Sequence, residues 1–427
     1  MIKILRKEEC VGCNACVQRC PKQCITMHED EQGFLYPSVE LDLCINCNLC
    51  EKVCPVINQA APREPLETFA GENPDDEVRM SSSSGGIFYA LAKMIIDKGG
   101  VVFGAKFNEQ WEVVHDFTET LEGIKAFQGS KYVQSRIGNT FQQAESFLKD
   151  GRKVMFTGTP CQIASLNLFL RKDYGKQLLK VDVICHGVPS PVVWREYLKY
   201  ITRPKEASDA KNTFFTSLKG TPVITDISFR DKRLGWEKYG FSVHVAASQA
   251  SGEHSGSQSA DKRDNNSSIP LFQLHNENPY FWAFNYAYIL RPSCFACPAK
   301  SCKSGSNITI GDFWNIKKKY SDIDTRRGIS LIMVHNKEMS EFICKNLIIR
   351  QTDYNTAVHC VQSIVKPAKK PTKYDKFWKF YNTDGVRILN SFFWKYRISK
   401  KQKFIINPVK KMLGKSLVQT IKKYLRK

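Results

Sequence analysis

One cysteine spacing occurs twice near the start of this chain, and it constrains the fold more than any other feature. The run C-x2-C-x2-C-x3-C-P begins at Cys10 and again at Cys44. Thiolates two residues apart on a tight loop reach three corners of one four-iron cubane, and the fourth cysteine, before proline, reaches a second cubane. The repeat therefore predicts two 4Fe-4S clusters whose ligand sets are crossed between the two runs.

The crossed arrangement divides the eight cysteines into two ligand sets. Cluster one is predicted to bind Cys10, Cys13, Cys16 and Cys54. Cluster two is predicted to bind Cys20, Cys44, Cys47 and Cys50. Zinc is the alternative, but structural zinc sites use two pairs of ligands, which rows of four thiols do not match. Cys24 lies outside the repeat and is expected to be a small buried residue.

This spacing is typical of bacterial ferredoxins, so residues 1–60 are predicted to form a small α+β, ferredoxin-like dicluster domain with a hairpin that turns at Gly33.

The length of 427 residues predicts two to four domains. The N-terminus lacks the apolar segment of a signal peptide, and no stretch of 18 apolar residues is present. We therefore expect a cytoplasmic protein, in which grouped cysteines bind metal rather than form disulfides.

The net charge of +21 is concentrated at the C-terminus. Residues 1–60 carry −2, residues 61–365 carry +6 and residues 366–427 carry +17, which sum to +21. Because the central part is close to neutral and no reader motif is present, a nucleic-acid-binding surface over the whole protein is not indicated.

Two successive strand–turn–helix patterns predict a mostly parallel α/β sheet in the central body. The segment RKVMFTGTPCQIASLNLFL has the pattern strand, Gly-Thr-Pro turn, helix, with Cys161 at the turn, and Cys185 takes the same place in KQLLKVDVICHGVPSPVVWREYL. Because the carboxyl ends of adjacent parallel strands meet at one edge, where such sheets bind ligands, both thiols are expected in one site. Cys294 and Cys297, in a C-x2-C, complete a set of four, and Cys302 is a rival ligand.

Two polar loops of the body are candidate anion sites. Ser81–Gly86 precedes a helical pattern, and hydroxyls and bare amides before a helix N-terminus favour a flavin or nucleotide phosphate, although an ordinary N-cap is the alternative. Gly129–Ser135 forms a second loop with one cation. Asp312 is interpreted as a turn former rather than a cofactor contact, and His186 as a turn residue rather than a proton relay.

Six motifs in this order resemble one family when they follow a double ferredoxin run. They are SSSGGIF, GSKYVQS, GTPCQI, VICHGVPSP, RPSCFAC and ITIGDFW. The chain resembles the coenzyme F-420 hydrogenase/dehydrogenase beta-subunit family with an N-terminal dicluster ferredoxin domain. The resemblance covers residues 1 to about 335 and divides the body into residues 66–150 and 151–335. One departure is PAKSCKSGSN, with Lys303 and Asn307 near places where relatives show Arg and Asp, which keeps Cys302 as an alternative ligand.

The resemblance implies an iron–sulfur flavoprotein with an α/β flavin-binding body, FAD and a third 4Fe-4S cluster. Carried over by position, the body cluster would be held by Cys161, Cys185, Cys294 and Cys297. The flavin region would be lined by Ser83, Ser84, Gly85, Gly86, Ser130, Lys131 and Tyr132. No residue is singled out as catalytic.

The leading hypothesis is an oxidoreductase that moves electrons from the ferredoxin-type clusters through the body cluster to the flavin, and on to or from an unidentified small molecule or redox partner protein. The resemblance suggests a role in surface-polysaccharide biosynthesis. Two alternatives remain: a non-catalytic electron-transfer subunit of a larger complex, and an iron–sulfur protein that senses redox state or binds nucleic acid.

Residues 366–427 are predicted to form a basic amphipathic tail. After Pro408, apolar residues recur every three or four positions from Val409 to Leu425, with lysines on the other face. Such a helix can lie on an anionic membrane, at the inner face of the membrane for a cytoplasmic protein, and the aromatics Trp378, Phe392, Phe393 and Trp394 favour an interface. Packing of the apolar stripe on the body is the equal alternative, and nucleic acid is a third, weaker one.

Overall fold

The computed structural model of the chain describes residues 1–202, 223–246 and 268–398. None of the helices within these residues is long and apolar enough to cross a bilayer. The helix predicted after Pro408 lies outside the described residues.

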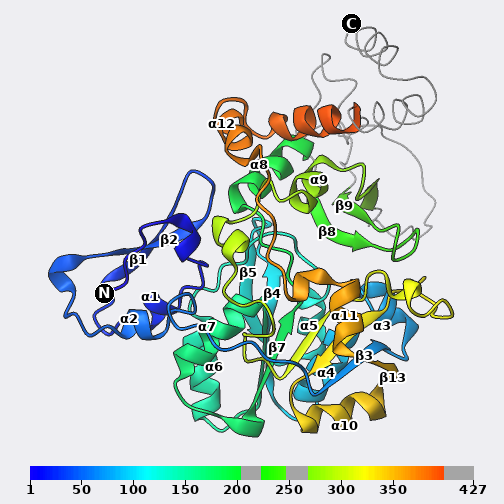
Figure 1. Cartoon of the computed structure of the whole chain (residues 1–427), viewed down its shortest axis with the longest axis horizontal. Helices are drawn as coiled ribbons and strands as arrows, with labels where there is room; N and C mark the ends of the chain where they lie inside the picture. Colours follow the sequence, from blue (N-terminus) through cyan, green and yellow to red (C-terminus); the bar gives the residue numbers. More distant parts are fainter. Residues whose placement is uncertain (203–222, 247–267, 399–427) are drawn as a thin grey trace, which may run out of the picture.

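The N-terminal module is small and ferredoxin-like, as predicted. Its helices are α1 (Ala15–Arg19) and α2 (Leu49–Lys52), and its antiparallel hairpin joins β1 (Ile25–Glu29) to β2 (Leu35–Val39). The hairpin turns at Gly33, whose φ of 80° favours glycine, and the Gly33 amide donates to the Asp30 carbonyl at 2.8 Å. In Figure 1 the module projects from one side of the body, next to α6 and α7.

The body is built on one eight-stranded sheet with the order β13-β3-β12-β11-β7-β6-β4-β5. The strands are β3 (Glu67–Glu72), β4 (Val101–Phe107), β5 (Val113–Thr118), β6 (Val154–Gly158), β7 (Leu178–Val183), β11 (Ile308–Asp312), β12 (Ser330–Val334) and β13 (Ile348–Thr352). The four central strands β11, β7, β6 and β4 are parallel, and the outer pairs are antiparallel. The predicted sheet is therefore present, mixed at both sides of a parallel centre.

Helices cover both faces of this sheet, because successive strand side chains point in opposite directions. Val102 of β4 packs in a core with α4 (Ile87–Ile96), α5 (Leu121–Phe127) and α10 (Lys337–Asn346). Its neighbours Val101 and Phe103 face α6 (Thr140–Lys149) and α7 (Pro160–Leu170). Val11, Cys13 and Val53 of the N-terminal module join this second core, so the module packs directly against α6 and α7.

A second lobe stands at the carboxyl end of the sheet. It contains an antiparallel sheet of β8 (Ile224–Asp231), β9 (Gly240–Ala246) and β10 (Ser268–Leu274), with α8 (Pro191–Thr202) and α9 (Pro279–Asn285) (Figure 1). Its core is rich in aromatic side chains, among them Trp194, Phe241 and Tyr280.

The described part of the predicted tail packs on this lobe through α12 (Tyr374–Asp384) and a helical stretch at 387–398. Trp378 and Phe393 are only 4% and 3% exposed in the aromatic core. These two side chains are therefore core residues, which corrects the prediction that they face an interface. An amphipathic pattern does not distinguish a protein core from a lipid surface as the apolar partner.

Candidate functional site

The four thiols of the first predicted ligand set lie close enough together to influence one another. Burial raises the pKa of the Cys13 thiol to about 12, and negative charge on Cys10 and Cys54 adds to this rise. Burial also raises the pKa of the Cys16 thiol, and negative charge on Cys13, Cys10 and Cys54 raises it further. Thiolates so close together are unfavourable alone, but bound iron supplies the compensating positive charge.

The second ligand set lines a small cavity of about 20 Å³, and its members are Cys20, Cys44, Cys47 and Cys50. The Ile2 amide donates to the Cys50 sulfur at 3.2 Å, and Cys47 is exposed to solvent. Cys24 is buried as expected, but its sulfur lies 3.4 Å from that of Cys20 and it lines the same cavity.

The four predicted body cysteines also come together. Cys161 lies in the first turn of α7, after β6; Cys185 follows β7; Cys294 and Cys297 belong to the 3-10 turn at Pro292–Ala296 and its end. Burial is the main cause that raises the pKa of Cys161, and negative charge on the other three thiols raises it further. The Val188 amide donates to the Cys294 sulfur at 3.4 Å, which ties the loop after β7 to the C-x2-C loop.

Cys302 lies apart from this set. Burial and the charge of Asp182 raise its pKa to about 11, while Arg63 acts in the opposite direction, and none of the four body thiols is among the largest influences on it. Within the described residues no three His, Cys, Asp or Glu side chains converge on a position for a single metal ion. A 4Fe-4S cubane is instead surrounded by four thiolates.

Arg291 connects the module to the body. Its buried guanidinium donates to the Cys10 carbonyl at 2.7 Å, the Gln134 side chain at 3.0 Å and the Leu35 carbonyl at 2.8 Å. It also precedes Cys294 by three residues. A second link is Ser165 of α7, which donates to the Cys161 carbonyl at 2.6 Å and hydrogen-bonds Cys13. Neither residue was singled out from the sequence.

A cavity of about 660 Å³ opens at the carboxyl ends of β6, β7 and β11, the edge predicted to bind a ligand. Six of the seven predicted flavin residues line it, namely Ser83, Ser84, Gly86, Ser130, Lys131 and Tyr132. Gly85 lies behind the wall, where a Cβ would stand 2.5 Å from the Gly71 carbonyl oxygen. Cys185 lines the cavity too, so the body thiols and the predicted flavin region share a wall.

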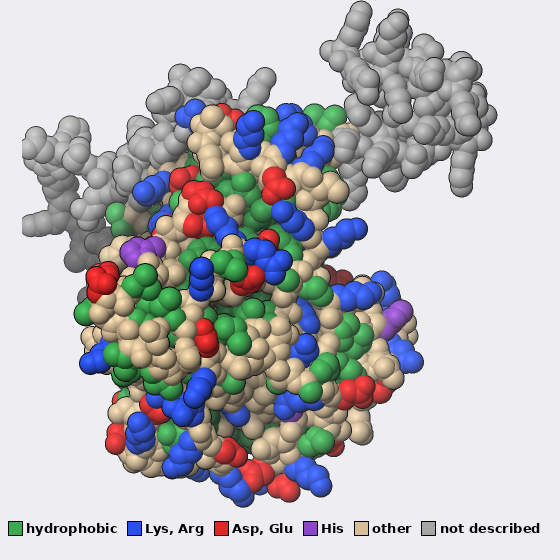
Figure 2. Space-filling view, turned by 60° about the vertical axis from the view of Figure 1, so that its left-hand side comes forward, with side chains coloured by type: hydrophobic (Ala, Val, Ile, Leu, Met, Phe, Trp, Pro, Cys, Tyr) green, Lys and Arg blue, Asp and Glu red, His purple; other side chains and the backbone are tan. Residues whose placement is uncertain are grey.

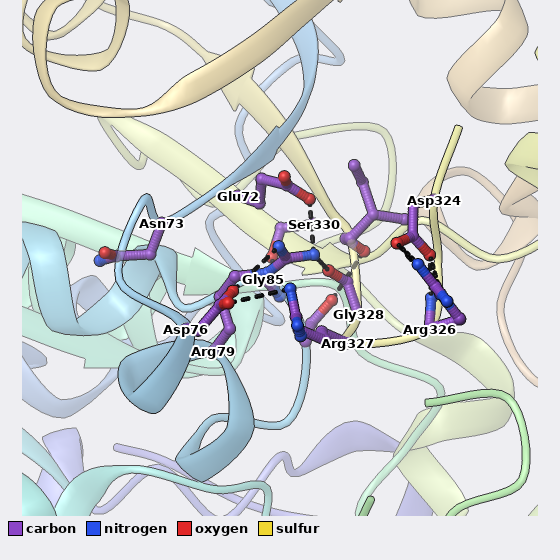
Figure 3. Close-up of polar contacts among 12 residues, drawn as sticks. Glu72, Asn73, Asp76, Arg79, Gly85, Asp324, Arg326, Arg327, Gly328 and Ser330 are labelled. Atoms are coloured by element: carbon purple, nitrogen blue, oxygen red, sulfur yellow. Dashed lines mark hydrogen bonds and ion pairs between the residues drawn. The ribbon is translucent and has the colours of Figure 1, made fainter. Parts of the chain in front are cut away.

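The Ser-Gly loop is held rigidly at this cavity. The Gly85 amide donates to the Ser330 hydroxyl at 2.9 Å, and Ser83 accepts from the Ser130 amide at 2.6 Å. Behind the loop, Arg79 pairs with Glu72 at 2.6 Å and donates to the Gly328 carbonyl at 3.1 Å (Figure 3).

Lys232 also holds the Ser-Gly loop. Its buried ammonium donates to the carbonyls of Ser84, at 3.1 Å, and of Arg327, at 2.7 Å, as well as to that of Arg79. These bonds fix the start of α4 with its amide groups at the cavity wall.

Asp312 is an ion-pair anchor, which corrects its interpretation as a turn former. Arg230 donates to both of its carboxylate oxygens, at 2.6 and 3.0 Å, and Trp236 donates at 2.8 Å. The same guanidinium donates to the Tyr132 hydroxyl and the Ser83 carbonyl, both at 3.1 Å. Arg230 therefore joins the motifs that contain Ser83, Tyr132 and Asp312. Nothing in the sequence indicated this role, since a lone arginine in a strand is usually exposed.

Two histidines at the cavity carry buried nitrogens without a partner. His115 Nε2 donates to the Thr157 carbonyl at 3.0 Å, which leaves Nδ1 as an unpaired acceptor. Burial lowers the pKa of His115 to about 4, so the ring is neutral. Nε2 of His186 is also unpaired. These polar atoms, the fixed amides of the Ser-Gly loop and an apolar wall that includes Phe88 and Phe284 fit a bound flavin dinucleotide.

Lys131 supplies a cation at the second loop. Its ammonium donates to the carbonyls of Gln128 and Gly129 at 2.9 and 3.2 Å. Burial lowers its pKa to about 7. An anion bound in the cavity would stabilise the charged form of Lys131.

Two protein-family models match the parts of the chain that contain most of the motifs. Residues 151–354 match the C-terminal region of the coenzyme F-420 hydrogenase/dehydrogenase beta-subunit family, and residues 9–58 match the 4Fe-4S dicluster domain. A chain of the F-420-reducing nickel–iron hydrogenase complex from Methanosarcina barkeri, in a xenon-derivatized structure, is 14% identical over 80% of this chain and 94% of that chain, with a TM-score of 0.41. No curated protein matches the chain. The dicluster domain with its two 4Fe-4S clusters is thereby confirmed.

Proposed function

Because the chain carries the C-terminal region of a coenzyme F-420 hydrogenase/dehydrogenase beta subunit behind a 4Fe-4S dicluster domain, we propose a specific electron path through it. The path runs in either direction through four groups in series. They are the cluster on the second ligand set of the module, the cluster on its first ligand set, a third cluster on the body cysteines and a flavin in the cavity. Cys185 carries this proposal, since it belongs to the body thiol set and also lines the cavity.

The order of the two module clusters along this path follows from what surrounds their ligand sets. The first set contacts the body through Ser165 and lies beside Arg291, whereas the second set has the exposed Cys47. The outer end of the path is therefore the second set, where a redox partner protein exchanges single electrons. The inner end is the flavin, which when bound converts single-electron steps into two-electron or hydride transfer to or from a small molecule.

Several residues at the cavity have a role toward the FAD that we propose there. Ser83, Ser84, Gly86 and Ser130 present amides and hydroxyls to its phosphates, and Lys131 adds positive charge. Arg230 and Asp312 hold Ser83 and Tyr132 in place. The idea that this path serves surface-polysaccharide biosynthesis rests on the family resemblance alone.

The proposal is tested by anaerobic purification followed by iron, sulfide and flavin analysis. We expect about twelve iron atoms and one FAD per chain, and about eight iron atoms in Cys185→Ser. Cys302→Ser is the matched control, because this thiol lies in the body but outside the set, and it should keep the wild-type iron content. A wild-type content near eight, or loss of four iron atoms in Cys302→Ser alone, would contradict the assignment. Cys297→Ser gives a second test if Cys185→Ser does not fold.

A further inference from the structure

The helices at the C-terminal end of the described chain have one face in the aromatic core and one face toward solvent. In α12 the side chains of Tyr374, Phe377 and Tyr381 are buried. In the stretch 387–398, Ile388 and Phe393 are buried. Both helices lie at the outer edge of the second lobe (Figure 1), and Tyr374 at the start of α12 donates to the Gln32 side chain of the N-terminal module at 3.3 Å. The core contacts therefore fix which side chains point outward.

The outward side chains of the second helix form a continuous stripe. Arg387, Ser391, Trp394, Lys395 and Ile398 are all exposed, and their spacing of three or four positions places them on one helix face. Trp394 is 46% and Ile398 54% exposed, large fractions for apolar side chains of this size. A face with this composition is unusual for a helix that only contacts water.

The first helix extends this stripe. Lys376, Lys379 and Phe380 of α12 are exposed, and the rings of Phe380 and Phe392 lie 6.5 Å apart, so the two helices adjoin there. Figure 2 shows Lys and Arg side chains beside hydrophobic ones at this end of the molecule. We name this surface the outer face, and its members are Lys376, Lys379, Phe380, Arg387, Trp394, Lys395 and Ile398.

The sequence of this C-terminal region is strongly basic. Residues 366–398 contain nine Lys or Arg and two Asp, and one of these acids, Asp375, pairs with Lys370 at 3.1 Å. The sequence that follows, residues 399–427, adds ten Lys or Arg and no acidic residue. A partner that matches this surface must carry dense negative charge over an apolar layer.

From this charge and composition we infer that the outer face binds the surface of an anionic lipid bilayer. Lysines and arginines contact the headgroups, while Trp394, Phe380 and Ile398 enter the boundary between headgroups and acyl chains. The aliphatic Ile398 and the exposed indole favour lipid over nucleic acid, whose recognition needs base or backbone contacts. The inference is independent of the cluster and flavin assignments.

The test is co-sedimentation of the full-length holoprotein with phosphatidylcholine vesicles, with and without about a third phosphatidylglycerol. We expect binding only to the anionic vesicles, weakened by high salt. Reversing three outer-face charges, with Lys376→Glu, Lys379→Glu and Lys395→Glu, should weaken binding at least about tenfold. The matched control reverses three exposed lysines elsewhere, with Lys98→Glu, Lys125→Glu and Lys149→Glu, and should bind clearly more tightly than the outer-face variant.

A second pair of variants tests the apolar contribution. Trp394→Ser with Phe380→Ser should reduce binding to anionic vesicles, whereas Leu234→Ser with Ile348→Ser, which removes apolar side chains of similar exposure from other surfaces, should not. Absence of binding by the wild type would overturn the inference. So would unchanged binding of both outer-face variants, which would assign the contact to residues 399–427, or tighter binding of duplex DNA than of vesicles.

Discussion

The N-terminal module and the body assemble their thiols in opposite ways. In the module, every ligand comes from two short runs between residues 10 and 54, and small loops are enough to position them. In the body, the set joins the end of β6, the end of β7 and a loop that begins at Pro292. The first arrangement is local and the second is tertiary. Changes inside the body should therefore affect the body set and the cavity while the module keeps its clusters.

The largest expected effect comes from the buried ion pair of the body. Arg230→Ala leaves the Asp312 carboxylate without its bidentate partner, which should cost about 3–5 kcal/mol of unfolding free energy. Flavin should also be lost, since Arg230 holds Ser83 and Tyr132. Anaerobic urea unfolding measures the first effect and released flavin the second. Equal loss of the two module clusters would contradict the separation of module and body.

A change at the contact between the two regions should be smaller. Arg291→Met removes the bonds to the Cys10 and Leu35 carbonyls and should destabilise the protein by about 2–3 kcal/mol. All clusters should still assemble, because no thiol ligand is altered. Limited proteolysis should release the module faster than in the wild type. Unchanged proteolysis would show that Arg291 does not couple the regions.

The stability of the protein should depend on pH through His115, which lines the cavity. Its folded pKa of about 4 lies below the usual value of 6.5, so the folded state binds fewer protons than the unfolded state. The contribution of His115 to the free energy of unfolding is constant above pH 6.5. Stability is lost as the pH falls below that value, by about 1 kcal/mol at pH 5.5.

The matched variant for this prediction is His115→Gln, which keeps a side-chain donor for the Thr157 carbonyl but cannot titrate. The difference in unfolding free energy between wild type and variant should therefore change with pH over this window. A difference that is independent of pH between 8 and 5.5 would mean that His115 is not neutral and buried in solution.

The smallest effect is expected at Thr159. Its hydroxyl lies 3.2 Å from the Cys161 sulfur and caps α7 together with Gln162. Thr159→Val should cost about 1 kcal/mol. It should also shift the reduction potential of the body cluster, because a hydrogen bond to a ligand sulfur tunes the cluster. A redox titration followed by EPR should leave the module potentials unchanged, and a shift in those potentials would contradict the local role of Thr159.

The motifs of this molecule and the sheet edge could be predicted from the sequence, whereas the side-chain pairs that join distant segments could not. Contiguous spacing was enough to predict the dicluster domain, and the strand–turn–helix pattern placed Cys161 and Cys185 at one sheet edge. Arg230 and Asp312 are far apart in the chain, and no local pattern pairs them. Arg291 was missed for the same reason. For Trp378 and Phe393 the sequence left a membrane interface and packing on the body as equal alternatives, because a helix has the same apolar period against a protein core as against lipid.

Rapid mixing shows whether the clusters lie in series and end at the flavin. Flavin reduction by a low-potential one-electron donor protein would be followed in the wild type and in Cys16→Ser, which disrupts only the first module set. If the clusters act in series, Cys16→Ser retains its flavin and body cluster but reduces the flavin far more slowly than the wild type does. Reduction at the wild-type rate would contradict the series arrangement.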